Sequence, residues 1–226
     1  MATAVKKTNW FAIWVSIAVV VVLVAVIVVV ALMNNSANEP AARPASAGIE
    51  QESGAIQIGT GPDVVSVYFD FFCSHCQQFE SVYGDTIAEG LTDGSITLEL
   101  HPVALAGLNA ASGTDFSKRG SNAMYCVADA EPEAAWTFYS EVFALNPGGQ
   151  GLTDEELLSL AGDAGVTGID DCVAERTWDD LVAEQTRTLP ANPATGSAGT
   201  PTLLVNGEYV PVTLDPEADI TARLAG

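Results

Sequence analysis

The chain has 226 residues, with 29 acidic against 8 basic side chains and a formal net charge of -21. Nucleic acid selects basic surfaces, so this balance argues against a nucleic-acid partner, and the acidic residues are expected to form a solvated surface. Four cysteines, an even number, suit an oxidising compartment in which all of them can be paired.

Residues 10–33 form an uncharged stretch made mostly of Val, Ala, Ile and Leu. At about 1.5 Å per residue, a helix of this length crosses the roughly 30 Å of a bilayer's hydrocarbon core, so we expect a single transmembrane helix. Lys6 and Lys7 precede it, and no basic residue follows before Arg43. The positive-inside rule therefore predicts that residues 1–9 are cytoplasmic and that the rest of the chain lies outside the cell membrane.

A cleaved signal peptide is the alternative to this anchor, because residues 45–47, Ala-Ser-Ala, resemble a processing site. The apolar run is longer than the roughly 7 to 15 residues of a signal peptide's apolar region, and the triplet lies far from its end. Retention of the helix is therefore the favoured interpretation. Residues 34–54 mix Pro, Ala, Ser and Gly without apolar periodicity, which predicts an extracytoplasmic linker ahead of a domain at residues 55–226.

Two cysteines with two residues between them directly follow a predicted buried strand. Residues 64–69 are β-branched and aromatic and residues 76–91 place apolar side chains at helical spacing, so Cys73 and Cys76 open a helix. The N–H groups and dipole of a helix N-terminus favour an anion, which makes Cys73 the candidate nucleophile. Cys76, one turn later, can close a disulfide with it or resolve a mixed disulfide. His75, when protonated, would stabilise the thiolate further.

A metal site is the main alternative to a redox pair. A structural zinc site needs four ligands, and the remaining cysteines, Cys126 and Cys172, stand apart from each other in the sequence. The alternative that we retain is a metal-binding module that uses Cys73, Cys76 and His101. Redox chemistry is favoured over it, and we expect no metal and no other cofactor.

Two further strands and a block of helices are predicted around the cysteine motif. Residues 55–59 could form a short first strand and residues 95–100 a third, giving a β-α-β unit with the thiols at the start of its crossover helix. No strand pattern appears from about residue 102 to residue 190, where capping and breaking signals divide the chain into helices. These helices are expected at residues 115–130 and 132–145, after a capping box at residues 153–156, and at residues 169–189.

The other two cysteines fall within this helical block. Cys126 lies inside its first helix and Cys172 near the start of its last. They could be two separate buried thiols, or they could pair in an oxidising compartment. In the chain-entropy treatment, a bridge that closes roughly 47 residues contributes about 4 kcal/mol to stability. The residues alone leave both alternatives open.

Strand signals return near the end of the chain. Two apolar runs, residues 199–205 and 208–212, flank Asn206-Gly207, and an Asn-Gly between such runs is the strongest short-range hairpin signal. Pro201 lacks the N–H that a strand ladder uses, so it is expected to turn the chain. Residues 215–224 are predicted to form a last helix, capped by an Asp with Pro in its first turn.

These motifs together resemble the DsbA-type thiol:disulfide oxidoreductases of the thioredoxin superfamily. The likeness rests on residues 71–80, Phe-Phe-Cys-Ser-His-Cys-Gln-Gln-Phe-Glu, and on residues 199–207, Gly-Thr-Pro-Thr-Leu-Leu-Val-Asn-Gly. The resemblance covers about residues 55–226. It implies an α/β thioredoxin fold with a helical domain inserted at about residues 102–190, here preceded by one N-terminal transmembrane helix.

The resemblance also implies roles for particular residues. Pro201 is expected to be cis and to lie against the Cys73–Cys76 pair, where it helps to hold the substrate chain together with Ser74 and Thr200. Thr200 is further expected to tune the site. The membrane-anchored form with an extra cysteine pair is similar to homologues from Gram-positive actinobacteria, and this similarity suggests that Cys126 pairs with Cys172.

One departure from the family pattern concerns a proton acceptor. Many thioredoxin-like proteins carry a buried acid six residues before the first cysteine, where this chain has Val67. Asp70, three residues before Cys73, is expected to be a solvated residue of the strand-to-helix turn. The group that accepts the proton of Cys76 is therefore left open.

The predicted function is an extracytoplasmic oxidase that introduces disulfides into secreted proteins through Cys73 and Cys76. A reductase or an isomerase of the same fold is the alternative, because Ser74 stands where such oxidases often have Pro and Thr200 also occurs in isomerases. The expected partners are reduced or unfolded secreted proteins and, as the family implies, a membrane quinone-linked reoxidase.

Overall fold

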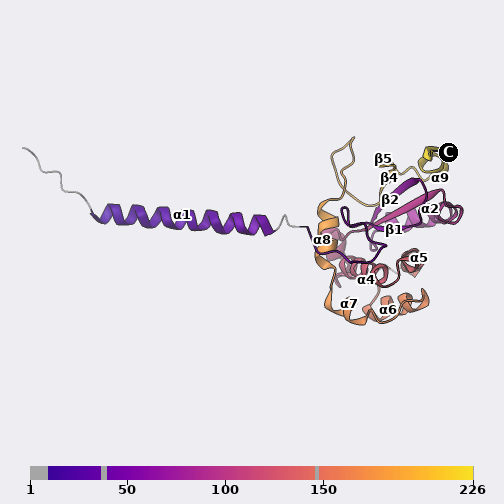
Figure 1. Ribbon diagram of the computed structural model, residues 1–226, viewed down its shortest axis with the longest axis horizontal. Coiled ribbons are helices and arrows are strands. Elements are labelled where there is room, and N and C mark those ends of the chain that lie inside the picture. Colours follow the sequence, from indigo (N-terminus) through magenta and orange to yellow (C-terminus); the bar gives the residue numbers. More distant parts are fainter. Residues whose placement is uncertain (1–9, 37–39, 146–147, 226) are drawn as a thin grey trace, which may run out of the picture. The chain divides into compact units, whose positions relative to one another are not determined.

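The computed structural model describes residues 10–36, 40–145 and 148–225. The chain divides into two compact units, Met1–Pro40 and Ala41–Gly226, which are described separately (Figure 1). In the first unit, α1 spans Trp10–Ser36. Its residues 13–31 have a mean hydropathy of 3.4, so α1 is long and apolar enough to cross a membrane.

The second unit is built on a five-stranded mixed sheet with the strand order β1-β3-β2-β4-β5. β2 and β3 pair in parallel, and every other neighbouring pair is antiparallel. This arrangement places β2, the strand that leads into the cysteines, at the centre of the sheet. The strands are β1 (Ile56–Ile58), β2 (Asp63–Phe69), β3 (Ile96–Pro102), β4 (Thr202–Val205) and β5 (Glu208–Val210).

Alternation along β2 divides the sheet into an apolar and a polar face. Val65, Val67 and Phe69 are fully buried, and the first two pair with Leu98 and Leu100 of β3. The intervening side chains carry polar groups, and they pair across the same two strands as Ser66↔Glu99 and Tyr68↔His101. Ser66 and His101 are also buried, so the difference between an apolar and a polar face, and not exposure of one face, sets the register of this strand.

The helix α2 (Ser74–Asp93) follows β2 and begins two residues earlier than the predicted residue 76. Its buried residues recur at three- and four-residue spacing, so one face of the helix packs on the sheet. They are Cys76, Phe79, Tyr83, Ile87 and Gly90. A side chain at Gly90 would meet Ile96 within 3.0–3.3 Å, so this glycine allows the end of α2 to approach β3 closely. The helix ends at Gly94, which has a left-handed conformation with φ 77°.

The helical insertion surrounds α4, most of whose side chains are buried. Figure 1 shows α4, α6 and α7 gathered on one side of the sheet, with α8 returning toward it. The insertion consists of α3 (Ala106–Ser112), α4 (Phe116–Ala130), η1 (Pro132–Ala134), α5 (Ala135–Leu145), α6 (Asp154–Asp163), α7 (Asp170–Glu175) and α8 (Asp179–Arg187). The architecture confirms the predicted thioredoxin fold with an inserted helical domain.

Three helical predictions differ from the structure in detail. The helix expected at residues 169–189 is broken into α7 and α8, because Arg176 has a left-handed conformation and the Trp178 N–H bonds to the side chain of Asn122. The helix α3 was not predicted, since its sequence of small residues has no apolar periodicity. The last predicted helix is two short ones, α9 (Pro216–Asp219) and η2 (Thr221–Arg223).

Residues 41–54, which we expected to belong to the linker, pack against the domain. The Arg43 guanidinium lies 2.5 Å from the Glu184 carboxylate of α8, and both side chains are largely buried. The Ala41 N–H donates to the same carboxylate at 2.5 Å. Ile49 is buried in the hydrophobic core, and Gly48 lies against Pro132. The compact unit therefore begins at Ala41.

Candidate active site

The strand-to-helix turn holds the two thiols in place through backbone hydrogen bonds. The Cys73 N–H donates to the Asp70 carbonyl oxygen at 3.0 Å, and Cys73 is the N-cap residue of α2. Its own carbonyl oxygen accepts from the N–H groups of Cys76 and Gln77 at 3.0 and 3.1 Å. The thiol of Cys73 therefore lies at the N-terminus of α2, as the sequence predicts. Cys73 and Cys76 are free thiols in this structure.

Cys73 is the more acidic of the two thiols. The hydrogen bond with the Cys76 thiol lowers its pKa to about 5, assisted by the Thr200 side chain and by the backbone N–H groups of Cys76 and His75, against the opposing effect of burial. Cys73 is therefore a thiolate at neutral pH. We expected it to lie at an exposed helix end, but it is only 5% exposed, so access to its sulfur is narrow.

Cys76 has the opposite character. It is 1% exposed, and burial together with the neighbouring Cys73 raises its pKa well above the ordinary value of 9.0. One thiol is thus held as an anion while the other keeps its proton. This division gives the pair an attacking or leaving sulfur at Cys73 and a protonated resolving sulfur at Cys76.

The loop before β4 lies against Cys73. The Thr200–Pro201 peptide bond is cis, and the Cys73 thiol donates to the Thr200 carbonyl oxygen at 3.4 Å. The Thr200 hydroxyl is buried without a partner at normal hydrogen-bond geometry, and it lowers the pKa of Cys73. The structure therefore brings Thr200 to Cys73, and Pro201 follows it in the same loop.

A cavity of about 440 Å³ opens beside this loop. The exposed imidazole of His75 lies on one side of it, and Thr200 and Pro201 lie on the other. Its complete lining is His75, Gln78, Asn192, Thr200, Pro201, Tyr209, Pro211, Val212 and Leu214. Ser74 is exposed at the first turn of α2 but does not line this cavity. The lining combines apolar side chains with the amides of Gln78 and Asn192.

His101 lies in a different environment from the thiols. Its ring stacks on Tyr68 with centroids 4.0 Å apart, its Nδ1 hydrogen-bonds to Gln185 Oε1 at 2.8 Å, and its Nε2 lies 3.9 Å from Glu99. Cys73, Cys76 and His101, all within the described part of the chain, do not form a group that could hold a metal ion.

Asp70 is the main site residue that sequence reasoning misjudged. We expected a solvated turn residue, but the side chain is 0% exposed. Its carboxylate accepts hydrogen bonds from the N–H groups of Phe72 and Leu105 at 2.9 and 2.8 Å. An isolated Asp after a strand is typical of a turn, and the sequence carries no signal that Leu105, in a distant loop, would cover it.

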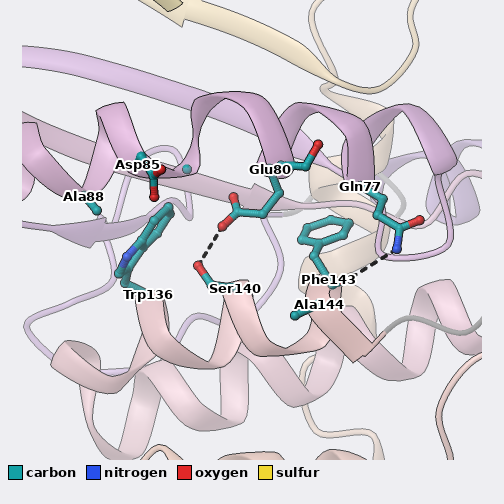
Figure 2. Close-up of a pocket in the computed structure, with 10 residues that line it drawn as sticks. Gln77, Glu80, Asp85, Ala88, Trp136, Ser140, Phe143 and Ala144 are labelled. Carbon is teal, nitrogen blue, oxygen red and sulfur yellow. Dashed lines mark hydrogen bonds between the residues drawn. The ribbon is translucent and has the colours of Figure 1, made fainter.

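A second cavity, of about 490 Å³, lies between α2 and α5. Figure 2 shows the Glu80 carboxyl between the two helices, where the Ser140 hydroxyl donates to it at 2.7 Å and the Trp136 ring closes one side. Burial raises the pKa of Glu80, and the Ser140 and Tyr139 hydroxyls partly offset this effect. This cavity places a carboxyl one helical turn beyond Cys76 on α2.

Cys126 and Cys172 form a disulfide between α4 and α7. Asn122, fully buried on α4, braces it: its amide donates to the Cys172 carbonyl oxygen at 3.3 Å, and its side-chain oxygen accepts from the Trp178 N–H at 2.8 Å. The bridge lies in the helical insertion, whereas Cys73 and Cys76 lie at the end of the central strand.

The sequence from residue 56 to residue 219 matches the family described as thioredoxin. This chain belongs to the thioredoxin family. Its solved relatives narrow the assignment further. The oxidised DsbA of Mycobacterium tuberculosis is 29% identical, with a TM-score of 0.63 over 74% of this chain and 90% of that one. No curated protein sequence matches the chain.

Two further structures of the thioredoxin family place this member among the thiol-disulfide oxidoreductases. The reduced disulfide bond oxidoreductase DsbG of M. tuberculosis is 27% identical, with a TM-score of 0.62 over 76% of this chain and 89% of that one. The thiol-disulfide oxidoreductase MdbA of Actinomyces oris is 26% identical, with a TM-score of 0.58 over 84% of this chain and 95% of that one. This thioredoxin-family protein is therefore a DsbA-like protein-disulfide oxidoreductase, as the sequence motifs predicted.

Proposed function

We propose that this protein is a membrane-anchored, extracytoplasmic oxidase that introduces disulfides into secreted proteins through Cys73 and Cys76. The observation that carries the proposal is the pKa of Cys73, lowered to about 5. The thiolate exists only in the reduced protein, so whatever stabilises it makes the Cys73–Cys76 disulfide easier to reduce and hence a stronger oxidant.

The reaction begins from the Cys73–Cys76 disulfide. A substrate thiolate attacks the sulfur of Cys73, which forms a mixed disulfide and releases Cys76 as a thiolate that takes up a proton. A second substrate thiolate then attacks the substrate sulfur of the mixed disulfide and releases Cys73 as its stabilised thiolate. The substrate loses two electrons to the protein and gains one disulfide. We expect His75, Thr200 and Pro201, which line the cavity beside the cis-proline loop, to hold the substrate chain together with the exposed Ser74.

The reduced protein must then be reoxidised. A membrane quinone-linked reoxidase, the partner that the family uses, would take two electrons from Cys73 and Cys76 and restore their disulfide. The helix α1 supports a place for both proteins in one membrane, because it is long and apolar enough to serve as an anchor.

A reductase or isomerase of the same fold is the second candidate. Ser74 between the cysteines and Thr200 before the cis proline favour it. The reduction potential decides whether the protein oxidises or reduces its substrates. A strong oxidant of this fold has a potential of about -120 mV and thioredoxin one of about -270 mV, a difference of roughly 7 kcal/mol.

Equilibration of the full-length protein with glutathione buffers tests the direction. We expect a potential near the oxidising end of this range, together with formation of disulfides in a reduced, unfolded substrate. A potential near that of thioredoxin would make the protein a reductase.

Protease added to intact cells that lack an outer barrier tests the location of the domain. If the domain is protected from the protease even when it is unfolded, the extracytoplasmic assignment is wrong.

A further inference from the structure

Asp70 connects the cysteine turn to the helical insertion. It follows β2 directly, its carbonyl oxygen accepts the Cys73 N–H, and one carboxylate oxygen accepts the Phe72 N–H two residues on. The other carboxylate oxygen accepts the Leu105 N–H at 2.8 Å from the loop between β3 and α3. A single side chain therefore fixes the turn that presents the nucleophile and joins it to a distant loop.

This carboxyl is buried without a cation. None of the ion pairs among the described residues includes Asp70. The nearest charged side chains of α4 are engaged elsewhere, since Lys118 pairs with Asp179 and Arg119 with Asp154. On α4, the buried neutral hydroxyl of Ser117 lowers the pKa of Asp70.

The titratable groups of its own turn are the two thiols and the exposed imidazole of His75. Burial raises the pKa of Asp70 to about 6, and the negative charge of Cys73 raises it further against the hydrogen bonds that it accepts. Coupling between two sites is reciprocal. If the Cys73 thiolate makes Asp70 harder to ionise, an ionised Asp70 disfavours the Cys73 thiolate by the same free energy.

We propose that Asp70 is a positioning residue whose buried carboxyl also makes the redox equilibrium of Cys73 and Cys76 depend on pH, because its ionised form opposes the Cys73 thiolate. The inference rests on the proposed redox role of the two cysteines. At pH values above the pKa of Asp70, the ionised carboxylate therefore makes the Cys73–Cys76 disulfide a weaker oxidant than it would be with a neutral residue at position 70.

The proton balance follows from the reaction with glutathione. Two glutathione thiols reduce the protein disulfide and become oxidised glutathione, giving up two electrons and two protons. One proton goes to Cys76, Cys73 keeps a negative charge, and the second proton is released to the solvent. Near the pKa of Asp70, the new charge on Cys73 also draws a proton onto Asp70. Reduction there takes up more than one proton, so the equilibrium depends on pH differently from that of a site with a neutral residue.

The test compares wild type with Asp70→Asn by glutathione equilibration at about pH 8 and about pH 5, on either side of the Asp70 titration. Asn keeps an acceptor for the Phe72 N–H and removes the charge. At the higher pH we expect the variant disulfide to be reduced more readily, by less than about tenfold, because the Cys73 charge raises the pKa of Asp70 less than burial does. Toward the lower pH, where the wild-type carboxyl is protonated, the difference should shrink toward zero. Glu89→Gln, which removes an exposed charge from α2, should match wild type at both values.

A purely structural role would change the equilibrium equally at both pH values, and that result would overturn the proposal. If Asp70→Asn does not fold, as judged by circular dichroism, Ser117→Ala decides instead. That variant keeps the carboxylate but removes the hydroxyl that lowers its pKa, so the pH-dependent step should move to higher pH; an unchanged step would overturn the proposal. A wild type that fails to exchange with glutathione at any pH would refute the proposed function itself.

Discussion

The sulfur of Cys73 lies 3.4 Å from the carbonyl oxygen of Thr200, to which the protonated thiol donates a hydrogen bond, although 127 residues separate the two in sequence. The nucleophile at the end of β2 therefore lies against the loop that leads into β4. β2 and β4 are neighbours that pair in the sheet. Through this contact the sheet register positions one sulfur, and Thr200 adds a hydroxyl that lowers the pKa of Cys73.

Replacement of Thr200 by Val should raise the pKa of Cys73. The variant keeps the β-branched shape and the backbone carbonyl but loses the hydroxyl. A hydrogen bond to a charged group contributes about 1.5 kcal/mol, so we expect an increase of about 1 from the present value. The ultraviolet absorbance of the thiolate, followed against pH in the reduced protein, measures it. Thr195→Val removes a hydroxyl that pairs with Ser197 and should leave the titration unchanged.

The reduced protein should gain stability as pH rises. The pKa of Cys73 is lowered from 9.0 to about 5, so the folded state binds the thiol proton less tightly than the unfolded chain does. This contribution is fully present above the unfolded pKa and is lost as pH falls through the folded one. Between about pH 5 and about pH 8, it amounts to about 4 kcal/mol.

Urea unfolding of the reduced protein at both pH values measures this gain, with reduced Cys73→Ser as the control in which the contribution is absent. Titrating groups that are not coupled to Cys73 cancel in the difference between the two proteins, whereas the pKa values of Asp70 and Cys76 also respond to the loss of the Cys73 charge. An equal pH dependence of wild type and Cys73→Ser would contradict the assignment of the low pKa to Cys73.

The parts of the fold that were predicted correctly are those with a local signal. The alternation of residues 64–69 identified the central strand, and Asn206-Gly207 identified the hairpin because both residues need the positive φ angles found there, 53° and 78°. The break between α7 and α8 has no such signal. It depends on a tertiary hydrogen bond, since the Asn122 side chain takes the Trp178 N–H that a continuous helix would use.

In the site, too, the residues that were predicted correctly are those with a local sequence signal. Spacing and position identified Cys73 and Cys76 as a pair at a helix N-terminus, and the motif around Pro201 identified the loop beside them. The burial of Asp70 could not be read from its neighbours, because Leu105 and Ser117 create its environment. The packing of residues 41–54 on the domain likewise depends on Arg43 reaching Glu184, a contact over 141 residues.

Loss of the Cys126–Cys172 disulfide should destabilise the protein without abolishing redox chemistry. The bridge spans a sequence separation of 46, for which the chain-entropy treatment gives about 4 kcal/mol. A Cys126→Ser and Cys172→Ser double variant should therefore unfold at lower urea but keep the glutathione equilibrium of Cys73 and Cys76. A large change in that equilibrium would show that the bridge takes part in the redox reaction.

Asn122 should contribute almost as much to the unfolding free energy as the Cys126–Cys172 disulfide beside it. Its side chain is fully buried and satisfies the Trp178 N–H and the Cys172 carbonyl oxygen. Asn122→Ala leaves both groups without this partner, and each lost buried hydrogen bond costs about 1 kcal/mol or more. We expect a loss of about 2 to 3 kcal/mol in unfolding free energy. Asn122→Asp, which keeps the acceptor for Trp178, should retain part of it.

Ionisation of Glu80 should destabilise the fold, because its carboxyl lies between α2 and α5 (Figure 2). Burial raises its pKa, and one of its oxygens is buried without a hydrogen-bond partner. Because the folded pKa is above the unfolded one, the ionised carboxyl destabilises the fold, and stability is lost as pH rises from the unfolded pKa through the folded one. Glu80→Gln keeps the shape and the acceptor for Ser140 but cannot ionise. Relative to wild type, its unfolding free energy should therefore improve as pH rises from about 4.5 to about 7.5. Glu89→Gln, exposed on the same helix, should show no such trend, and a Glu80→Gln difference that is constant with pH would mean that Glu80 titrates as an exposed acid.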